Sequence, residues 1–390
     1  MGRMKRIYLD DAGSAPVLPQ VGDALRALPG GNPSSPHTEG RAARAALDRA
    51  RDEAGAALGA HRTEITFLSS GTEAVNLALL GTAQRLSKKA LIVTWAAEHQ
   101  SVLAAVRHLQ AEGHAVQIAG VDGHAMADPA AIAAGTALVS IGLANNEVGT
   151  IQPVEAVIKC AHDAGALVHV DACAGPRWIP IPQGADLVSI SGHKLGAGRG
   201  GLLFVREGLK LTPLLYGGPQ EWGRRAGHED VESAIAVATA LTVCSQERAS
   251  RSRAAERQSG SLRALLLELG ATLTGAGERL PNFASATFSG RKGEDMLLAL
   301  DLAGVAASSG SACASGSLDP SHVLLAMGLS LEQALGSLRV TTGYATTDED
   351  VSRAGAIVRS TLAHTAAHAL ASKKSWRGGS RAAKRSSSPP

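Results

Sequence analysis

The sequence predicts an α/β protein with a doubly wound, mainly parallel sheet and a second, smaller α+β domain. Short apolar runs, rich in leucine or β-branched residues, alternate with segments of helical periodicity, as in a sheet whose strands are connected by helices. The runs are apolar at consecutive positions, as expected for strands covered on both faces. The 390 residues, 45% of them hydrophobic, also exceed the roughly 250–300 residues that a single core usually holds, so we expect two domains.

The larger predicted domain covers residues 16–254. Its strands are predicted, in order, at 64–68, 90–94, 137–144, 166–172, 186–191 and 201–205, each a short apolar run. Helices are predicted between some of them at 72–86, 100–110 and 154–162, where apolar residues recur with helical periodicity. A long helical connection, rich in arginine and glutamate, is predicted at residues 230–260.

The smaller predicted domain covers residues 1–15 and 255–372, with strand candidates at 284–289 and 337–343. Residues 373–390 form a tail rich in Ser, Gly and Pro with six basic and no acidic side chains, a composition that predicts disorder. Without those six charges the net charge of +3 becomes −3, so the rest of the chain is mildly acidic. For this tail we prefer a solvated extension over contact with nucleic acid or with an acidic partner protein.

Composition argues against membrane, secreted and metal-stabilised classes. No run approaches the ~18 apolar residues of a membrane span, and the start "MGRMKRIYLDDAG" lacks the apolar region of a secretory signal, so we expect a cytoplasmic protein. The cysteines show neither a CxxC pair nor zinc-ligand spacing, so we expect no disulfide framework and no metal site. They are Cys160, Cys173, Cys244 and Cys313.

Candidate active-site residues lie where the predicted strands end, which is where open α/β sheets bind ligands. The stretch "FLSSGTEAVN" ends one strand and begins a helix, so the backbone N–H groups of Gly71 and Thr72 can hold a phosphate. Polar side chains at the other strand ends are His99, Asn145, Asn146, Asp171, Ser191, His193 and Lys194. Each alone has an ordinary interpretation, as a helix cap, a turn, a surface histidine or a lysine that extends to water.

Together these residues predict a site for pyridoxal 5′-phosphate. A lysine can form a Schiff base with the cofactor, and partial desolvation raises its nucleophilicity. A buried acid can keep the pyridine nitrogen protonated, so that the ring accepts electrons from the substrate Cα. The nearby "GAGRGG" at 196–201 satisfies G-x-G-x-x-G but leads into a predicted strand and not a helix, so we expect no dinucleotide site.

Over nearly its full length the sequence resembles the cysteine desulfurases, which belong to the class V aminotransferase family of fold type I pyridoxal phosphate enzymes. The stretches that carry this resemblance are, in chain order, "GNPSSPH", "SSGTEAVNLAL", "EHQSVL", "NNEVGTIQPV", "HVDA", "SGHK", "SSGSACASG" and "SLRVTTG". The stretch "SSGSAC" is similar to the branch that supplies sulfur for iron-sulfur clusters and tRNA thiolation. In that branch the reactive cysteine lies on a long mobile loop.

The resemblance implies a role for each candidate residue. Lys194 would be the Schiff-base lysine, Asp171 would pair with the pyridine nitrogen, and His99 would stack on the ring and help to move protons. The other implied roles are phosphate binding by Gly71, Thr72, Ser191 and His193, contact with the ring's phenolate edge by Asn146, substrate binding by Arg339 with Asn146, and sulfur acceptance by Cys313.

The implied reaction converts L-cysteine to L-alanine and leaves the sulfur on Cys313 as a persulfide. The persulfide then passes to an acceptor protein, whose identity the sequence does not give. The resemblance also implies a homodimer. Two alternatives stay open, a C–S lyase of the same fold that releases sulfide and pyruvate, and a non-catalytic sulfur-relay or binding protein.

Two positions depart from the family pattern. After "HVDA" the family usually has one variable residue and then a glutamine that hydrogen-bonds the cofactor phenolate, but this chain has Cys173 and Ala174. In "RRAGHED" the family usually has a threonine, which reaches the phosphate across a dimer interface, where this chain has His228. A histidine can also donate to a phosphate, so we expect the second contact to be altered and not lost.

Overall fold

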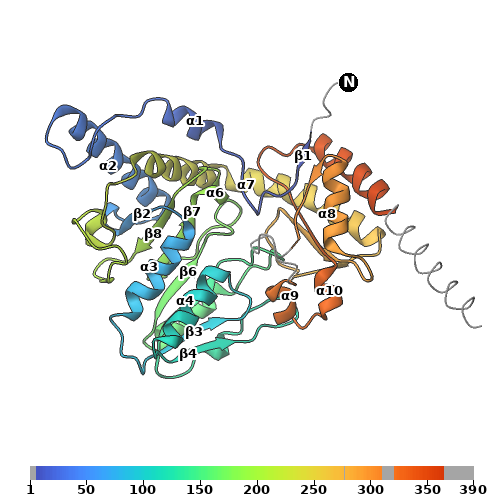
Figure 1. Ribbon diagram of the computed structural model, residues 1–390, viewed down its shortest axis with the longest axis horizontal. Coiled ribbons are helices and arrows are strands. Elements are labelled where there is room, and N and C mark those ends of the chain that lie inside the picture. Colours follow the sequence, from blue (N-terminus) through green and yellow to red (C-terminus); the bar gives the residue numbers. More distant parts are fainter. Residues whose placement is uncertain (1–5, 276, 310–319, 364–390) are drawn as a thin grey trace, which may run out of the picture.

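The computed structural model describes residues 6–275, 277–309 and 320–363. The strands of its largest sheet are β2 (Ile65–Leu68), β3 (Leu91–Trp95), β4 (Val116–Ala119), β5 (Thr136–Gly142), β6 (Leu167–Asp171), β7 (Leu187–Ser191) and β8 (Gly201–Val205). Within the described residues these seven strands lie in the order β2-β8-β7-β6-β5-β3-β4 (Figure 1). Strand β8 is antiparallel to β2 and β7, and the other neighbouring pairs are parallel.

The mainly parallel sheet predicted from the sequence is confirmed. The predicted strands agree with β2, β3, β5, β6, β7 and β8 to within two residues at each end. Strand β4 was not predicted. It lies at the edge of the sheet and its four residues are only partly buried, so it lacks the continuous apolar pattern of the central strands.

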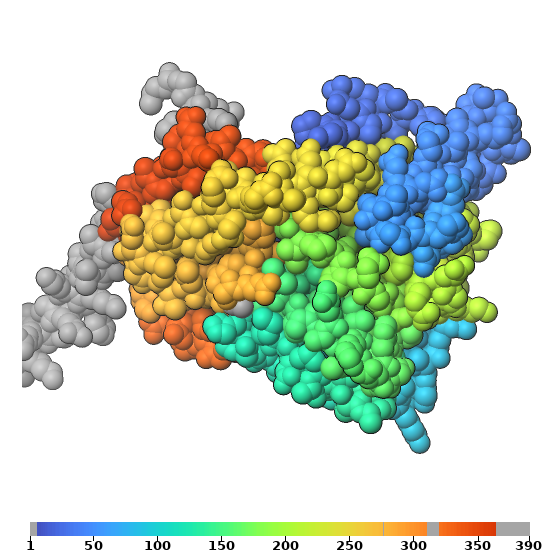
Figure 2. Space-filling view, turned by 180° about the vertical axis from the view of Figure 1, so that it is seen from behind, coloured from blue at the N-terminus to red at the C-terminus, as the bar shows by residue number. Residues whose placement is uncertain are grey.

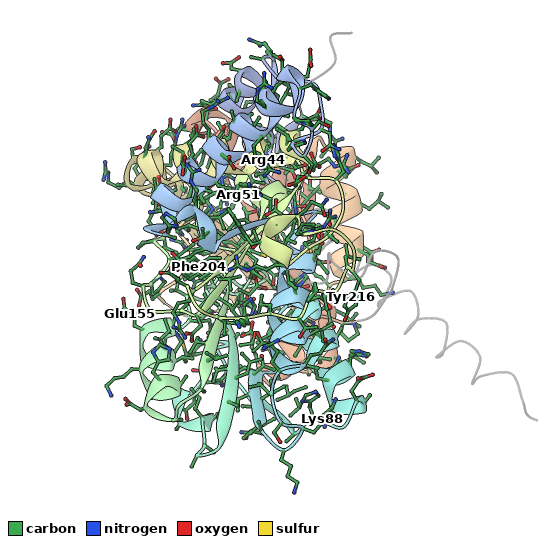
Figure 3. All side chains as sticks on the ribbon, turned by 90° about the vertical axis from the view of Figure 1, so that its left-hand side faces the viewer. Arg44, Arg51, Lys88, Glu155, Phe204 and Tyr216 are labelled. Carbon is green, nitrogen blue, oxygen red and sulfur yellow. The ribbon has the colours of Figure 1, made fainter. Side chains whose placement is uncertain are left out.

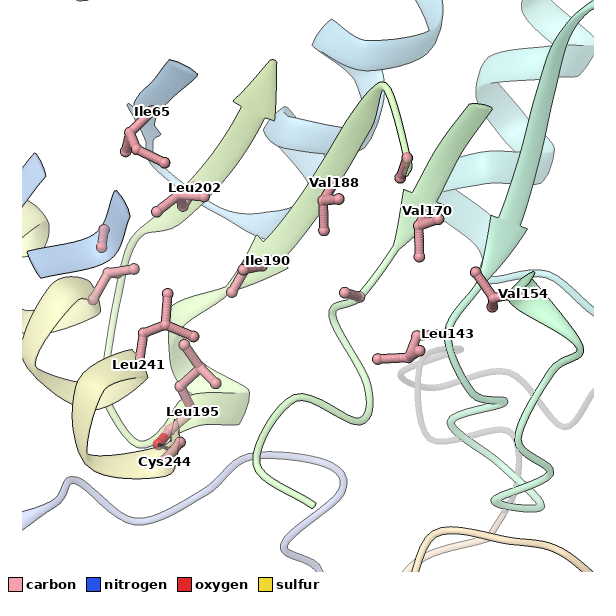
Figure 4. Close-up of a cluster of buried hydrophobic side chains, with 14 of the residues drawn as sticks. Ile65, Leu143, Val154, Val170, Val188, Ile190, Leu195, Leu202, Leu241 and Cys244 are labelled. Atoms are coloured by element: carbon pink, nitrogen blue, oxygen red, sulfur yellow. Dashed lines mark hydrogen bonds between the residues drawn. The ribbon is translucent and has the colours of Figure 1, made fainter. Parts of the chain in front are cut away.

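Helices cover both faces of the sheet. One face is covered by α3 (Gly71–Ala83) and α4 (Gln100–Ala111), and the other by α2 (Thr38–Leu58), α5 (Val154–Asp163) and α7 (Val231–Glu268). Successive side chains of a strand point to opposite faces. Val188 and Ile190 of β7 therefore lie on the side of Leu241 and Cys244 of α7 (Figure 4), whereas Leu187 packs on the side of α3.

A second cluster of buried apolar side chains surrounds the C-terminal half of α7. Ile7 and Leu9 of the N-terminal segment pack there with Leu262 of α7 and with Leu338 and Val340. Strand β1 (Ile7–Tyr8) pairs in parallel with β11 (Val305–Ala306), and β10 (Phe283–Thr287) lies antiparallel between β9 (Thr272–Leu273) and β12 (Ser337–Thr341). Other helices are α1 (Pro19–Leu25), α6 (Gly192–Leu195), α8 (Gly293–Leu302), α9 (His322–Ala326) and α10 (Leu331–Leu335).

Helix α7 connects the sheet to the second cluster without a break (Figure 1). Seen from behind in Figure 2, residues of this helix form a continuous ridge between the N-terminal segments and the later part of the chain. The helix passes through residue 254 and ends at Glu268, not at 260 as the sequence suggested. The domain boundary between residues 254 and 255 stays a prediction.

Two ion pairs, one buried and one partly exposed, connect α2 to residues 221–229, which precede α7. Arg51, whose side chain is 2% exposed, pairs with Glu221 at 2.7 Å. Two turns away on the same side of α2, Arg44 pairs with Glu229 at 3.0 Å, and Figure 3 shows both arginines on this helix. Because Glu221 is also almost fully buried, its carboxylate depends on Arg51 for a counter-charge.

We expect Arg51→Ala to lower the free energy of unfolding by about 3–5 kcal/mol, because Glu221 is left as an unpaired buried charge. Urea unfolding followed by circular dichroism measures this change. The matched control is Arg49→Ala, an exposed arginine on the same helix, which should change the free energy of unfolding by less than about 0.5 kcal/mol. Equal effects of the two substitutions would contradict a stabilising role of the buried pair.

Candidate active site

A cavity of about 240 Å³ lies at the carboxyl ends of β3, β5, β6 and β7, next to the first turn of α3. The candidate residues that line it are Gly71, Thr72, His99, Asn145, Asn146, Asp171, Ser191, His193, Lys194 and Arg339. His228 is exposed and is not among the residues that line the cavity in this single chain. Cys313 lies outside the described residues.

The N-terminus of α3 forms one wall of the cavity. Ser70 caps this helix, because its Oγ accepts the Glu73 N–H at 3.2 Å. The N–H groups of Gly71 and Thr72 belong to the first turn and therefore have no partner within the helix. A Cβ on Gly71 would lie 2.5 Å from Cys173 Sγ, so only glycine fits there. Free N–H groups and the helix dipole make this wall suitable for a phosphate.

Lys194 does not lie in the apolar sheet. Strand β7 ends at Ser191, and the chain turns at once into the short helix α6, which carries Lys194 at the edge of the cavity. This turn requires Gly192, because a Cβ there would lie 2.1 Å from the carbonyl oxygen of Arg199. On the same turn Ser191 Oγ lies 2.8 Å from His193 Nδ1, which adds two side chains that can donate to a phosphate.

Asp171 ends β6 and is 6% exposed. Its Oδ1 accepts hydrogen bonds from the Cys173 N–H and from Ser189 Oγ, both at 3.0 Å. Burial alone would raise the pKa of Asp171, but the neighbouring His169 and the hydrogen bonds from Cys173 outweigh burial and hold this pKa below its usual value. The cavity therefore contains a carboxylate that is ionised at neutral pH.

His99 caps α4, and its Nδ1 accepts the Ser101 N–H at 3.1 Å. Burial lowers the pKa of His99, so the imidazole is neutral at neutral pH, with Nδ1 as the acceptor.

The preceding residue, Glu98, also lines the cavity, although no role was predicted for it. Burial raises the pKa of Glu98 to about 8, and its Oε1 accepts the Gly142 N–H at 3.0 Å. The acid beside the histidine in "EHQS" was the signal for this residue.

Arg339 extends from β12 to the cavity, and its side chain is 2% exposed. Its Nη1 donates to the carbonyl oxygen of Asn146 at 2.8 Å, and its Nη2 donates to Asp10 Oδ1 at 2.8 Å. Sequence reasoning missed Asp10, for which the adjacent acids in "LDDAG" were the only signal. The arginine is thus fixed in place, and a guanidinium held in this way suits a planar carboxylate.

One of the two positions that depart from the family pattern, Ala174, lines the cavity, whereas the other, His228, does not. Cys173 and Ala174 line it where the expected glutamine is missing. Burial raises the pKa of Cys173 well above its usual value, so this thiol stays neutral. Cys244 is buried and Cys160 is exposed, so a thiol reagent in solution reaches Cys160 and not Cys244.

The residues present fit pyridoxal phosphate. The close approach of Gly71 to Ser191 and Cys173 leaves a wall of backbone N–H and hydroxyl donors for a phosphate. Asp171 supplies the charge that a protonated pyridine nitrogen requires, and Lys194 supplies the amine for a covalent link to the aldehyde.

Known proteins match this chain over most of its length. The model of the aminotransferase class-V family matches residues 7–354. The chain is 39% identical over 367 residues to "Cysteine desulfurase" of Trichormus azollae. This alignment covers 90% of this chain and 91% of that protein. It is 39% identical over 364 residues to "Cysteine desulfurase IscS" of Dictyoglomus turgidum, with 89% of this chain and 92% of that protein covered.

A solved structure, "NifS-like protein", superposes with a TM-score of 0.85 and 30% sequence identity, over 93% of this chain and 99% of that chain. The region that the family model matches contains the sheet, the cavity and most of the second apolar cluster. The chain therefore belongs to the aminotransferase class-V family, whose members depend on pyridoxal phosphate and share the fold of type I pyridoxal phosphate enzymes.

Proposed function

We propose that the protein is a cysteine desulfurase that converts L-cysteine to L-alanine and transfers the sulfur to Cys313. The observation that carries the proposal is that Lys194, Asp171 and Arg339 line one cavity together with a phosphate-binding helix terminus. Similarity to proteins named cysteine desulfurase supports the choice of substrate. Bound pyridoxal phosphate supplies an electron sink for negative charge at the substrate Cα.

The residues of the chain bind and orient the reactants. Arg339 binds the substrate α-carboxylate, because its guanidinium already lies at the cavity, held by Asp10 and Asn146. Asp171 holds a proton at the ring nitrogen. Lys194 binds the cofactor covalently at rest, and it takes the Cα proton of the substrate when its amine is displaced.

His99 and the phosphate-binding residues keep the cofactor in register with these groups. A neutral imidazole beside the ring can stack on it and can donate from Nε2 while Nδ1 accepts from the helix cap. Gly71, Thr72, Ser191 and His193 hold the phosphate. Asn146, whose carbonyl oxygen accepts from Arg339, would contact the cofactor and the substrate.

Sulfur transfer requires a thiolate, because thiolates and not thiols are nucleophilic. The Cys313 thiolate attacks the substrate sulfur and the C–S bond of the substrate breaks. The electron pair of that bond stays on Cβ, which takes a proton and becomes the methyl group of alanine. The balance is one L-cysteine and one enzyme thiol giving one L-alanine and one enzyme persulfide. The persulfide then passes to an acceptor protein, and the candidate pathways are iron-sulfur cluster assembly, tRNA thiolation or another thio-modification.

We also propose that the enzyme is a cytoplasmic homodimer with shared sites. His228 is exposed on the segment that precedes α7, away from the cavity of its own chain, so a partner subunit is needed to bring a second His228 to the phosphate. No helix in the described part of the chain is long and apolar enough to cross a membrane.

Cys313→Ala tests the proposed reaction. We expect this variant to bind the cofactor and L-cysteine but to form almost no alanine, because the sulfur has no acceptor. The assay measures alanine, pyruvate and sulfide from L-cysteine by chromatography and colorimetry. The matched control is Cys160→Ala, which removes an exposed thiol that does not line the cavity and should leave the rate unchanged. Alanine at the wild-type rate in Cys313→Ala would contradict the proposal, and pyruvate in place of alanine would favour a C–S lyase.

Mixed dimers test the shared site. When Lys194→Ala and His228→Ala subunits are co-expressed, about half of the dimers are mixed, and each mixed dimer has one intact site if the sites are shared. We expect roughly a quarter of the wild-type activity, measured at limiting cofactor concentration. Each variant alone is the control, and co-expressed protein no more active than the two separate variants would exclude a shared site.

A further inference from the structure

A row of buried polar side chains lies beneath the cavity and has no role in the proposed reaction. Ser140 of β5, His169 of β6 and Ser189 of β7 are each 0% exposed. Ser140 is paired with His169, and Ser189 with Asp171, in the registers of neighbouring strands. The apolar residues between them belong to the core on the opposite face of the sheet, so these polar side chains share the face of α3 and α4.

Hydrogen bonds connect this row to Asp171. Ser140 Oγ lies 2.9 Å from His169 Nδ1, and His169 Nε2 lies 3.1 Å from Ser189 Oγ. Ser189 Oγ donates to Asp171 Oδ1 at 3.0 Å. An ionised carboxylate can only accept, so the single hydroxyl proton of Ser189 is used there.

The position of that proton sets the direction of the other hydrogen bonds in the row. Ser189 Oγ must accept from His169 Nε2–H, and a neutral imidazole then accepts at Nδ1 from the Ser140 hydroxyl. Burial lowers the pKa of His169 to about 4, which agrees with a neutral ring at neutral pH. Every donor in this row of hydrogen bonds therefore points toward Asp171.

We propose that His169 is a positioning residue, which acts through Ser189 to keep the Asp171 carboxylate fixed, ionised and aimed at the cofactor ring nitrogen. This inference rests on the proposed function, because it presumes that Asp171 meets that nitrogen. The physical reason is that hydrogen bonds in a buried chain polarise one another, so an N–H donated to Ser189 Oγ strengthens the bond that Ser189 donates to Asp171. The opposite tautomer would turn the Ser189 proton toward His169 and away from the carboxylate.

Two substitutions of His169 separate this role from simple packing. His169→Gln keeps an N–H donor where Nε2 lies, whereas His169→Leu keeps bulk and loses the donor. The holoenzyme is loaded with pyridoxal phosphate labelled with ¹⁵N in the ring, and the ¹⁵N chemical shift reports whether that nitrogen is protonated. We expect a protonated ring in wild type and His169→Gln, and a shift toward the neutral ring in His169→Leu.

Kinetics give a second readout from the same variants. We expect kcat of His169→Leu to fall roughly tenfold, the effect of about one hydrogen bond, while KM for L-cysteine changes little because Arg339 is untouched. His169→Gln should recover most of this loss. The matched control is Thr94→Val, which removes another fully buried hydroxyl of the sheet, one that donates to the Ser140 carbonyl oxygen at 2.9 Å and not toward Asp171. Its ¹⁵N shift and kcat should equal those of wild type.

Equal ¹⁵N shifts in wild type and His169→Leu would overturn the inference, and so would equal effects of the Gln and Leu substitutions. If His169→Leu does not fold, Ser189→Ala provides the same test, because it removes the hydroxyl that donates to Asp171. A wild-type protein that binds the labelled cofactor but forms no alanine from L-cysteine would overturn the proposed reaction alone, because the ¹⁵N comparison does not depend on turnover. A wild-type protein that binds no cofactor would overturn both.

Discussion

A single buried negative charge, that of Asp171 at the end of β6, sets the conditions for the rest of the site. A carboxylate that is 6% exposed is stable as an ion only if donors surround it. The Cys173 N–H provides one donor from the turn after β6, and Ser189 provides another from the neighbouring strand β7. The charge therefore depends on the hydroxyl of Ser189 and on the conformation of the turn after β6, and it makes this end of the sheet suitable for a cationic ring nitrogen.

Two adjacent acids of the N-terminal segment provide the counter-charges for two buried arginines. Asp10 pairs with Arg339 at 2.8 Å, and Asp11 pairs with Arg177 at 2.6 Å. The N-terminal segment thus contacts β12 on one side and the turn after β6 on the other. Because Arg177 also lies 4.1 Å from the ring centroid of Tyr344, this part of the site is held by interactions between segments that are far apart in sequence. We infer that the N-terminal segment shapes the substrate end of the cavity.

The sequence predicted those features that depend on local pattern. Continuous apolar runs predicted the parallel strands, and the polar residues that follow them, such as Lys194, predicted the contents of the cavity. Long-range partners could not be predicted, because nothing local to Arg339 indicates that Asp10, 329 residues away, supplies its counter-charge. Alternating polar residues within a strand, as in "VHVD", indicate the hydrogen bonds that pass through His169. They were not recognised, because the apolar residues between them made the strand resemble a buried one.

The ionisation of Asp171 in its buried position can be measured by ¹³C NMR of protein labelled at the aspartate carboxyl carbons. Asp171→Asn assigns the resonance, which is then followed from about pH 8 to about pH 4. A pKa held below the usual value of ~3.9 predicts the chemical shift of a carboxylate from about pH 8 down to about pH 5, with protonation beginning only at lower pH. A resonance that titrates above about pH 5 would show that burial outweighs the hydrogen bonds and that Asp171 cannot be the stable buried anion of this site.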